Sequence, residues 1–206
     1  MVKINFMTFR VENKFVISKN KVFEFKKWMK KNNYKILYPK RKINSVYFDN
    51  KNFTIYTDSL EGITPRKKIR LRTYSNNFLN INNKFNYEVK ISSVEGRFKS
   101  SKIYETDIMK IFNGIYDKQY GMCYPVLNVI YEREYFSNNK SRITIDTNIK
   151  YFKIDGKRIS KHSKIDKHFV VENKSKFAEQ STMLNQFVFE NKRFSKYCNG
   201  IEKIQS

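Results

Sequence analysis

Cations stand at every second position in the segment KKIRLRTY, residues 67 to 74. Successive side chains of a β-strand point to opposite faces, so Lys68, Arg70 and Arg72 would share one face with Tyr74. Such a face is either solvated or lines an anionic ligand. Each guanidinium can hold two phosphate oxygens through parallel hydrogen bonds, and each lysine adds a point charge. The chemistry available to this segment is therefore the binding of phosphate groups.

The same arrangement recurs on four other predicted strands, where charged residues again occupy one face. These faces carry Arg10, Glu12 and Lys14; Glu88 and Lys90; Arg142, Thr144 and Asp146; and Glu172 and Lys174. Arg133 lies between two tyrosines of a further strand, and Arg193 lies near the C-terminus, so six of the ten arginines belong to such motifs. Salt-bridge ladders on a solvated sheet would explain any one of these faces. The concentration of a scarce residue type on them favours a shared ligand instead.

Carboxylates stand among these cations, and they need an explanation of their own. A barrel whose lumen held six or more cations would require water and counter-charge inside it, and oligophosphate would supply that charge. Glu12, Glu88 and Glu172 would repel phosphate unless a divalent cation bridged carboxylate and phosphate. Both groups offer hard oxygen ligands that suit Mg²⁺ or Mn²⁺. We therefore predict a metal ion held by these glutamates.

The elements that must position these residues are mostly strands. Alternation of polar and apolar residues predicts eight of them, at 9 to 17, 43 to 50, 53 to 58, 67 to 74, 85 to 92, 127 to 136, 141 to 149 and 168 to 174. Helical periodicity appears at 19 to 32, less regularly between 99 and 112, and again at 179 to 190. No repeat, proline-rich linker or low-complexity block divides the chain. The pattern favours one α+β domain over residues 1–206, an antiparallel sheet or barrel with a few packed helices.

The overall charge fits a polyanionic partner. Lys and Arg total 42 against 19 Asp and Glu, a formal net charge of +23, which attracts nucleic acid, acidic membranes or phosphate chains. The two cysteines lack metal-ligand spacing, and His162 and His168 show no spacing that indicates acid–base catalysis. No run approaches the ~20 apolar residues that span a bilayer, and the first residues do not form a signal peptide. We expect a soluble, cytoplasmic protein without membrane insertion.

Seven short motifs follow one another between about residues 9 and 197, in the order RVENK, SVYFDN, KIRLRTY, YEVK, YERE, RITIDT and VVENK. Together they resemble the VTC domain, the polyphosphate polymerase catalytic domain of the triphosphate tunnel (CYTH-like) metalloenzyme superfamily. The resemblance implies an eight-stranded antiparallel β-barrel tunnel with flanking helices, whose basic interior holds a phosphate chain together with Mn²⁺ or Mg²⁺. It also implies that Lys68, Arg70 and Arg72 line this tunnel.

The resemblance further implies roles for single residues. Glu172 matches the principal metal-binding glutamate, and Glu12 is a possible second carboxylate on the metal. The residues implied to bind phosphate are Arg10, Lys14, Lys68, Arg70, Arg72, Lys90, Lys99, Arg133, Arg142, Lys174, Arg193, Ser195 and Lys196, of which the last three belong to the motif RFSKY near one mouth of the tunnel. The residues implied to align the reactants and neutralise charge in catalysis are Arg70, Arg72, Arg133, Arg142 and Glu172.

The implied reaction is metal-dependent transfer of the γ-phosphate of ATP to the end of a growing polyphosphate, with ADP leaving. Related triphosphatases usually carry Glu-x-Glu-x-Lys in the first strand, and Arg10 stands in place of its first carboxylate here. That replacement favours a polymerase over a hydrolase because it removes a group that binds metal and orients water.

Two alternatives remain open. One is an inorganic triphosphatase or tripolyphosphatase on the same fold, because one tunnel can admit water as well as phosphate. The other is a non-catalytic protein that binds polyphosphate or nucleic acid. Carboxylates embedded among the cations weigh against nucleic acid. The partners that the resemblance implies are ATP and inorganic polyphosphate or triphosphate.

Overall fold

A computed structural model describes residues 10–74, 84–176 and 194–206. Its main feature is an antiparallel sheet with a continuous path of eight strands, each hydrogen-bonded to the next. In spatial order these are β1 (Arg10–Ile17), β11 (Phe169–Lys176), β8 (Ser141–Asp155), β7 (Gly121–Ser137), β2 (Lys35–Asp49), β3 (Arg66–Thr73), β4 (Lys84–Ser93) and β5 (Gly96–Glu105). Three short strands lie beside this path: β6 (Ile115–Asp117), β9 (Arg158–Ile159) and β10 (Lys164–Ile165). The predicted α+β fold with an eight-stranded antiparallel sheet is confirmed.

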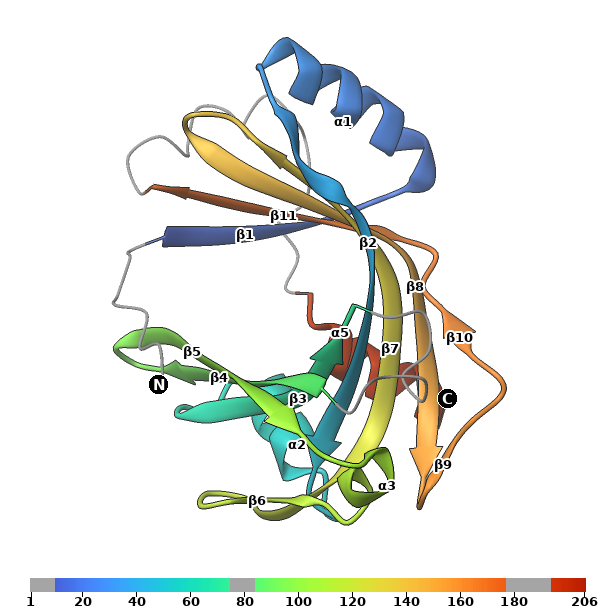
Figure 1. The fold of residues 1–206 in the computed structure, drawn as a ribbon. Helices are drawn as coiled ribbons and strands as arrows, with labels where there is room; N and C mark the ends of the chain where they lie inside the picture. The colour runs from blue at the N-terminus through green and yellow to red at the C-terminus, as the bar shows by residue number, and fades with distance from the viewer. Residues whose placement is uncertain (1–9, 75–83, 177–193) are drawn as a thin grey trace.

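The sheet curves around a central space. In Figure 1 the long strands β2, β7 and β8 run the height of the molecule, with β1 and β11 in its upper part and β3, β4 and β5 in its lower part. The edge strands β1 and β5 are not paired with each other in the described residues, so hydrogen bonds do not close the predicted barrel there. Within the described residues the sheet is a strongly curved wall whose two edge strands are not paired with each other.

Two helices pack on opposite faces of this wall. Helix α1 (Lys19–Lys31) buries Phe25 and Met29 against Phe15 and Ile145, on the outer face of β1 and β8. Helix α5 (Lys196–Gln205) packs on the inner face, where Tyr197 stacks on a tyrosine of β2 at 5.3 Å between ring centroids. A Cβ on Gly200 would approach Leu127 Cδ2 to 2.5 Å, so only glycine allows α5 to lie this close to β7. No helix within the described ranges is long and apolar enough to cross a membrane.

Two of the predicted elements are wrong. The segment 53 to 58 is not a strand but part of helix α2 (Thr54–Glu61). Its first turn is fixed by Asp49, whose carboxylate accepts hydrogen bonds from the backbone N–H groups of Ile55 and Tyr56, both at 2.9 Å. The helical periodicity between residues 99 and 112 covers instead most of strand β5 and the one-turn helix α3 (Ile108–Ile111).

Most of the other secondary-structure predictions from the sequence are confirmed. Helix 19 to 32 is confirmed as α1, and seven of the eight predicted strands are confirmed with shifted or extended ends. The eighth strand of the wall is β5, which was not predicted as a strand, whereas the predicted strand at 53 to 58 is absent from the sheet. The helix predicted at 179 to 190 lies outside the described residues. That residues 1–206 form one domain stays a prediction.

Candidate active site

The segment KKIRLRTY forms most of β3, and its cations Lys68, Arg70 and Arg72 point to the inner face of the wall. Arg70 lies opposite Tyr47 of β2 and Glu88 of β4 in the strand register, and directly opposite residues share a face. The contacts agree: Arg70 Nε donates to Glu88 Oε2 at 2.6 Å, and Arg70 Nη1 donates to the Tyr47 hydroxyl at 3.0 Å. Because Tyr47 also stacks on α5, this is the face that α5 covers at one end. The cationic row of β3 therefore lines the concave side of the sheet.

Glu88 is the first of three carboxylate centres on this face. Its Oε2 contacts Arg70 and lies 3.6 Å from Arg72 Nη1, and its Oε1 accepts from Lys99 Nζ at 2.6 Å. Burial raises the pKa of the Glu88 carboxyl, but Arg70, Arg72 and Lys99 outweigh burial and hold the pKa far below its usual range. Both oxygens of this predicted metal ligand thus contact cations, which fixes the orientation of three predicted phosphate-binding side chains.

Asp146 is the second centre, and sequence reasoning placed it on a charged face without assigning it a role. Arg133 grips it with two bonds, Nε to Oδ1 at 2.5 Å and Nη2 to Oδ2 at 2.7 Å, and Lys196 Nζ also donates to Oδ2. Tyr131 lies under these cations, with Arg133 and Lys196 over its ring and Arg72 Nη2 donating to its hydroxyl at 3.2 Å. Asp146 and Tyr131 thus connect cations from β3, β7 and α5.

The motif RFSKY contributes to the same centre. Ser195 caps α5 by accepting a hydrogen bond from the backbone N–H of Cys198 at 3.3 Å. Its hydroxyl also accepts from Lys68 Nζ at 3.0 Å, so β3 and α5 meet there. Burial lowers the pKa of Lys68 below its usual value. The predicted phosphate-binding residues Ser195, Lys196 and Lys68 are therefore brought together, while Arg193 lies outside the described residues.

Glu12 and Glu172 form the third centre, on β1 and β11. Lys174 Nζ lies between them, 3.0 Å from Glu172 Oε1 and 3.5 Å from Glu12 Oε2, and Lys14 Nζ contacts Glu12 Oε1 at 3.1 Å. Burial raises the pKa of Glu172, but Arg133, then the lysines Lys174 and Lys14, hold it well below the usual range. Burial and the Glu172 charge also raise the pKa of Glu12, but the nearby lysines outweigh them, and the pKa of Glu12 is lowered. Both carboxylates are thus charged at neutral pH.

The donor set of this third centre fits a divalent cation. Thr144 lies opposite Glu172 in the register, and its buried hydroxyl has no hydrogen-bond partner among the described residues. Mg²⁺ and Mn²⁺ commonly bind through one or two carboxylates together with water and substrate phosphates. Glu12, Glu172 and the Thr144 hydroxyl could supply this partial set once Lys174 turned toward phosphate. The part of the chain that the structure describes holds no group of three or more His, Cys, Asp or Glu suited to a metal.

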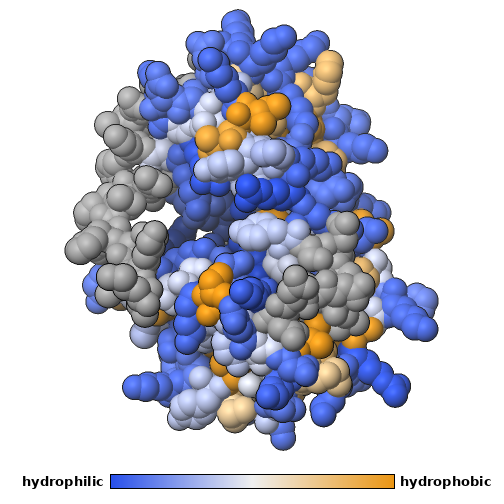
Figure 2. Space-filling view, in the orientation of Figure 1, coloured by the Kyte–Doolittle hydropathy of each residue, from blue (hydrophilic) through white to orange (hydrophobic). Residues whose placement is uncertain are grey.

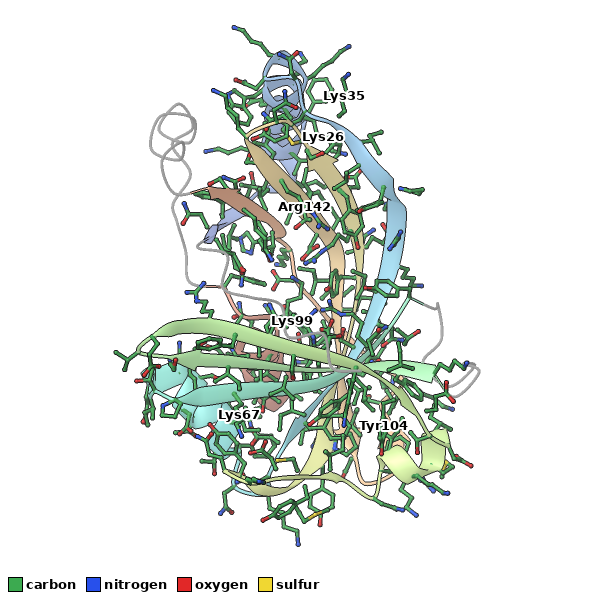
Figure 3. All side chains as sticks on the ribbon, turned by 60° about the vertical axis from the view of Figure 1, so that its left-hand side comes forward. Lys26, Lys35, Lys67, Lys99, Tyr104 and Arg142 are labelled. Carbon is green, nitrogen blue, oxygen red and sulfur yellow. The ribbon has the colours of Figure 1, made fainter. Side chains whose placement is uncertain are left out.

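Lys90 shows that the two halves of the wall face each other. It lies on β4, yet the charges that act on it come from both halves: Arg70 of β3, Glu12 of β1 and Glu172 of β11. Figure 3 shows two further cations of the opposing halves: Arg142 lies among the upper strands and Lys99 among the lower strands, on either side of the gap between them. In the space-filling view this face is hollowed between the two halves, and the exposed residues around the hollow are largely hydrophilic (Figure 2). The site is therefore a polar space lined by cations from both sides.

Lys90 also yields a measurable prediction. Burial, and next the charge of Arg70, lowers its pKa well below the usual value. A bound phosphate chain would raise the pKa of Lys90 again. Above the pKa that Lys90 has in the ligand-free protein, binding should therefore be accompanied by uptake of a proton; at lower pH Lys90 is already protonated and no uptake is expected. Calorimetric titration with tripolyphosphate in two buffers of different ionisation enthalpy would count these protons.

Two lysine variants make this test specific. Lys90→Met should reduce the proton uptake, whereas Lys84→Met should keep it because Lys84 lies on the same strand but is exposed. Equal uptake in both variants would show that Lys90 does not meet the ligand.

Arg142 lies opposite Lys174 in the register, but within the described residues it forms no ion pair with the carboxylates of the three centres. Its guanidinium packs over the rings of Tyr38 and Tyr135, at 5.8 and 5.5 Å from their centroids. Tyr47 and Tyr131 are site residues that sequence reasoning missed, although alternation within SVYFDN and the spacing in YERE put both on the charged faces. The side chain of Arg10 is not among those described.

Comparison with known proteins supports the fold and identifies the family. One similar structure is a candidate adenylate cyclase from Vibrio parahaemolyticus, with 11% identity, a TM-score of 0.54 and coverage of 95% of this chain and 98% of that chain. Another is a candidate adenylyl cyclase from Hippeastrum with a dominant triphosphatase activity, with 12% identity, a TM-score of 0.53 and coverage of 94% and 95%. No curated protein matches the sequence. The family model of the VTC domain matches residues 9–205, which is nearly the whole chain. The basic concave sheet, the order of its motifs and this match agree, and the chain belongs to the VTC domain family.

Proposed function

We propose that this protein is a metal-dependent polyphosphate polymerase that transfers the γ-phosphate of ATP to the end of a polyphosphate chain. Membership of the VTC domain family supports a role in polyphosphate or triphosphate chemistry. The observation that carries the proposal is the convergence of cations on one concave face, where three carboxylate centres hold them in place. Such a face offers a row of anchored positive charges to a chain of phosphates.

The reaction follows from alignment and charge neutralisation. The bond between the γ-phosphorus and the β–γ bridging oxygen of ATP breaks, and a terminal oxygen of the polyphosphate forms the new bond to that phosphorus. Arg70, Arg72 and Arg133 hold the two reactants in line and offset the negative charge of the transferred group. Lys68 and Lys196 hold phosphates beside them. ADP leaves with the bridging oxygen.

Glu172 and Glu12 are the residues that would hold Mn²⁺ or Mg²⁺, with the Thr144 hydroxyl beside them. The metal ion would supply further positive charge to the transferred phosphoryl group. Lys174 and Lys14 move from these carboxylates to phosphate when substrate enters, so charge remains balanced. Glu88 was predicted as a third metal ligand, and we assign it to positioning Arg70, Arg72 and Lys99 because it contacts all three.

A triphosphatase is the second candidate, and one observation favours it. The structurally similar Hippeastrum protein has a dominant triphosphatase activity. The difference between the two reactions is the acceptor, which is water in a hydrolase and phosphate in a polymerase. Arg10 stands where tunnel triphosphatases usually carry the first carboxylate of Glu-x-Glu-x-Lys, and a cation there favours a phosphate acceptor.

The first experiment is incubation of the purified protein with ATP and Mn²⁺, with ADP, free phosphate and acid-stable polyphosphate followed in one time course. We expect polyphosphate to accumulate in step with ADP. Release of free phosphate in place of polyphosphate would establish the triphosphatase, and no turnover with either ATP or tripolyphosphate would contradict both.

A pair of arginine variants controls for contaminating enzymes. Arg72→Met should remove the activity. The protein should still fold, because Glu88 would stay paired with Arg70 and Lys99. Arg158→Met should leave the activity unchanged because Arg158 is an exposed residue of the β8–β9 hairpin.

A further inference from the structure

The cationic rows of the concave face continue into a cluster of aromatic and arginine side chains. On β3 the row of Lys68, Arg70 and Arg72 is followed by Tyr74, one position beyond the strand. On β7 Tyr135 lies two positions beyond Arg133, and two positions apart on a strand means the same face. The end of β2 nearest α1 adds Tyr38 opposite Tyr135 in the register. The cluster therefore stands at one end of the phosphate-binding face.

Arg41 joins these rings into one unit. Its guanidinium carbon lies 5.2 Å from the ring centroid of Tyr38 and 5.7 Å from the centroids of Tyr74 and Tyr135. The rings of Tyr38 and Tyr135 meet edge to face at 5.7 Å between centroids. Arg142 approaches both of these rings from β8. We define the Tyr38 cluster as Tyr38, Arg41, Tyr74, Tyr135 and Arg142.

The Tyr38 cluster differs in chemistry from the three carboxylate centres. Arg70, Arg133 and Lys174 are each paired with a carboxylate, as expected of cations that exchange one anionic partner for another. Within the described ranges, no carboxylate lies within ion-pair distance of Arg41 or Arg142, and each packs on aromatic rings instead. Guanidinium planes and tyrosine rings are the surfaces on which nucleobases stack.

Two rings of the cluster are exposed to solvent. Tyr38 is 42% exposed and Tyr74 is 52% exposed, although both belong to a cluster that extends into the concave face. Aromatic side chains that keep so much surface in contact with solvent can gain burial from a flat apolar ligand. A polyphosphate chain has no such surface, whereas a nucleoside triphosphate has one at the end opposite its γ-phosphate.

The separation between the cluster and the phosphate-binding cations suits a nucleotide. Tyr135 follows Tyr131 by four residues on β7, and Tyr131 contacts Arg72, Arg133 and Lys196. Four residues along a strand span about 13 Å. The ribose and triphosphate of an extended nucleotide can bridge such a distance, so the base would lie on the cluster while the γ-phosphate points toward the cations around Tyr131.

We propose that the Tyr38 cluster is a nucleobase-stacking site, which makes a nucleoside triphosphate, and not an inorganic polyphosphate, the ligand that occupies this end of the concave face. The inference rests on the proposed function, because it places the phosphoryl donor in the same site. Stacking recognises the flat face shared by all bases, so ATP and GTP should bind with similar affinity and a pyrimidine nucleotide more weakly.

The test compares two ligands on the same variants. Affinities for ATP and for tripolyphosphate are measured by calorimetry with Mn²⁺ present, and stacking is followed by the quenching of 2-aminopurine riboside triphosphate fluorescence. Tyr38→Ala should weaken ATP binding by about 5- to 100-fold, the effect expected for loss of one stacked base, and should reduce the quenching. Its affinity for tripolyphosphate should remain within about twofold of that of the unmodified protein.

Two further variants keep the test interpretable. Tyr38→Phe keeps the ring and should keep ATP affinity. Tyr116→Ala, the control, removes a tyrosine that is 68% exposed on β6, away from the cluster, and should leave both affinities unchanged. Equal loss of ATP and tripolyphosphate affinity in Tyr38→Ala, or no loss of either, would overturn the stacking site. Failure of the unmodified protein to bind tripolyphosphate at all would instead count against the proposed function, so the two failures are distinguishable.

Discussion

Replacing Glu172 with glutamine should lower metal-dependent turnover by at least about 100-fold, the scale on which loss of one electrostatic contact to a transition state lowers kcat. Glutamine has nearly the same shape but lacks the charge that would hold Mn²⁺ or Mg²⁺. Lys174, whose side chain is 40% exposed, would keep Glu12 as a partner at 3.5 Å. Tripolyphosphate binding in the absence of metal should persist, because the phosphate-binding cations remain. The measurements are kcat against Mn²⁺ concentration and calorimetry with tripolyphosphate.

The control for Glu172→Gln is Glu24→Gln, which removes one carboxylate from the exposed side of α1. This variant should have unchanged kcat and unchanged metal dependence. The neighbouring cations hold the pKa of Glu172 below its usual range, so its charged form stabilises the fold at neutral pH and this contribution is lost only in acid. Glu172→Gln should therefore melt somewhat lower than the unmodified protein, and turnover must be assayed below its melting temperature. Full activity of Glu172→Gln at saturating metal would refute the metal assignment.

The faces of the strands could be predicted from the sequence because a strand repeats every two residues. In β3 the cations Arg70 and Arg72 alternate with Ile69 and Leu71, and both apolar residues are fully buried. The same rule places Glu172 beside Lys174 on one face. What alternation alone does not predict is the partner across strands. The contact between Arg70 and Glu88 depends on the register of β3 with β4, which the chain adopts only on folding.

Two elements were beyond sequence reasoning for identifiable physical reasons. The segment FTIYTD alternates like a strand, but its helix is fixed from outside the segment by the carboxylate of Asp49, which also accepts a hydrogen bond from the distant Tyr197. Strand β5 has only exposed or partly exposed residues, so it lacks the buried apolar face that alternation detects. Lys99 therefore came from the family resemblance alone, and its contact with Glu88 became visible only in the sheet.

The largest expected effect on stability is that of tripolyphosphate. The ligand-free protein carries a formal charge of +23 and brings cations from several strands to one face, while unfolding would disperse them. A ligand that binds only the folded state stabilises it by about 4 kcal/mol at one thousand times its Kd. For a chain of this size each kcal/mol raises Tm by roughly 2–4 °C, so saturating tripolyphosphate should raise Tm by about 10 °C. Thermal unfolding monitored by circular dichroism measures the shift.

Ionic strength and overall charge must be separated from occupation of the site. Sodium chloride at equal ionic strength screens the same repulsion without bridging the cations, so it should give a much smaller shift. Lys68→Gln and Lys30→Gln each remove one lysine charge, but Lys68 contacts Ser195 inside the site whereas Lys30 is exposed on α1. The shift should shrink in Lys68→Gln and persist in Lys30→Gln. If both variants kept the full shift, or if millimolar tripolyphosphate gave none, the cations of the concave face would not be the phosphate-binding groups. A loss confined to Lys68→Gln would locate the bound phosphate where β3 meets α5, because only a ligand at that point can distinguish these two lysines.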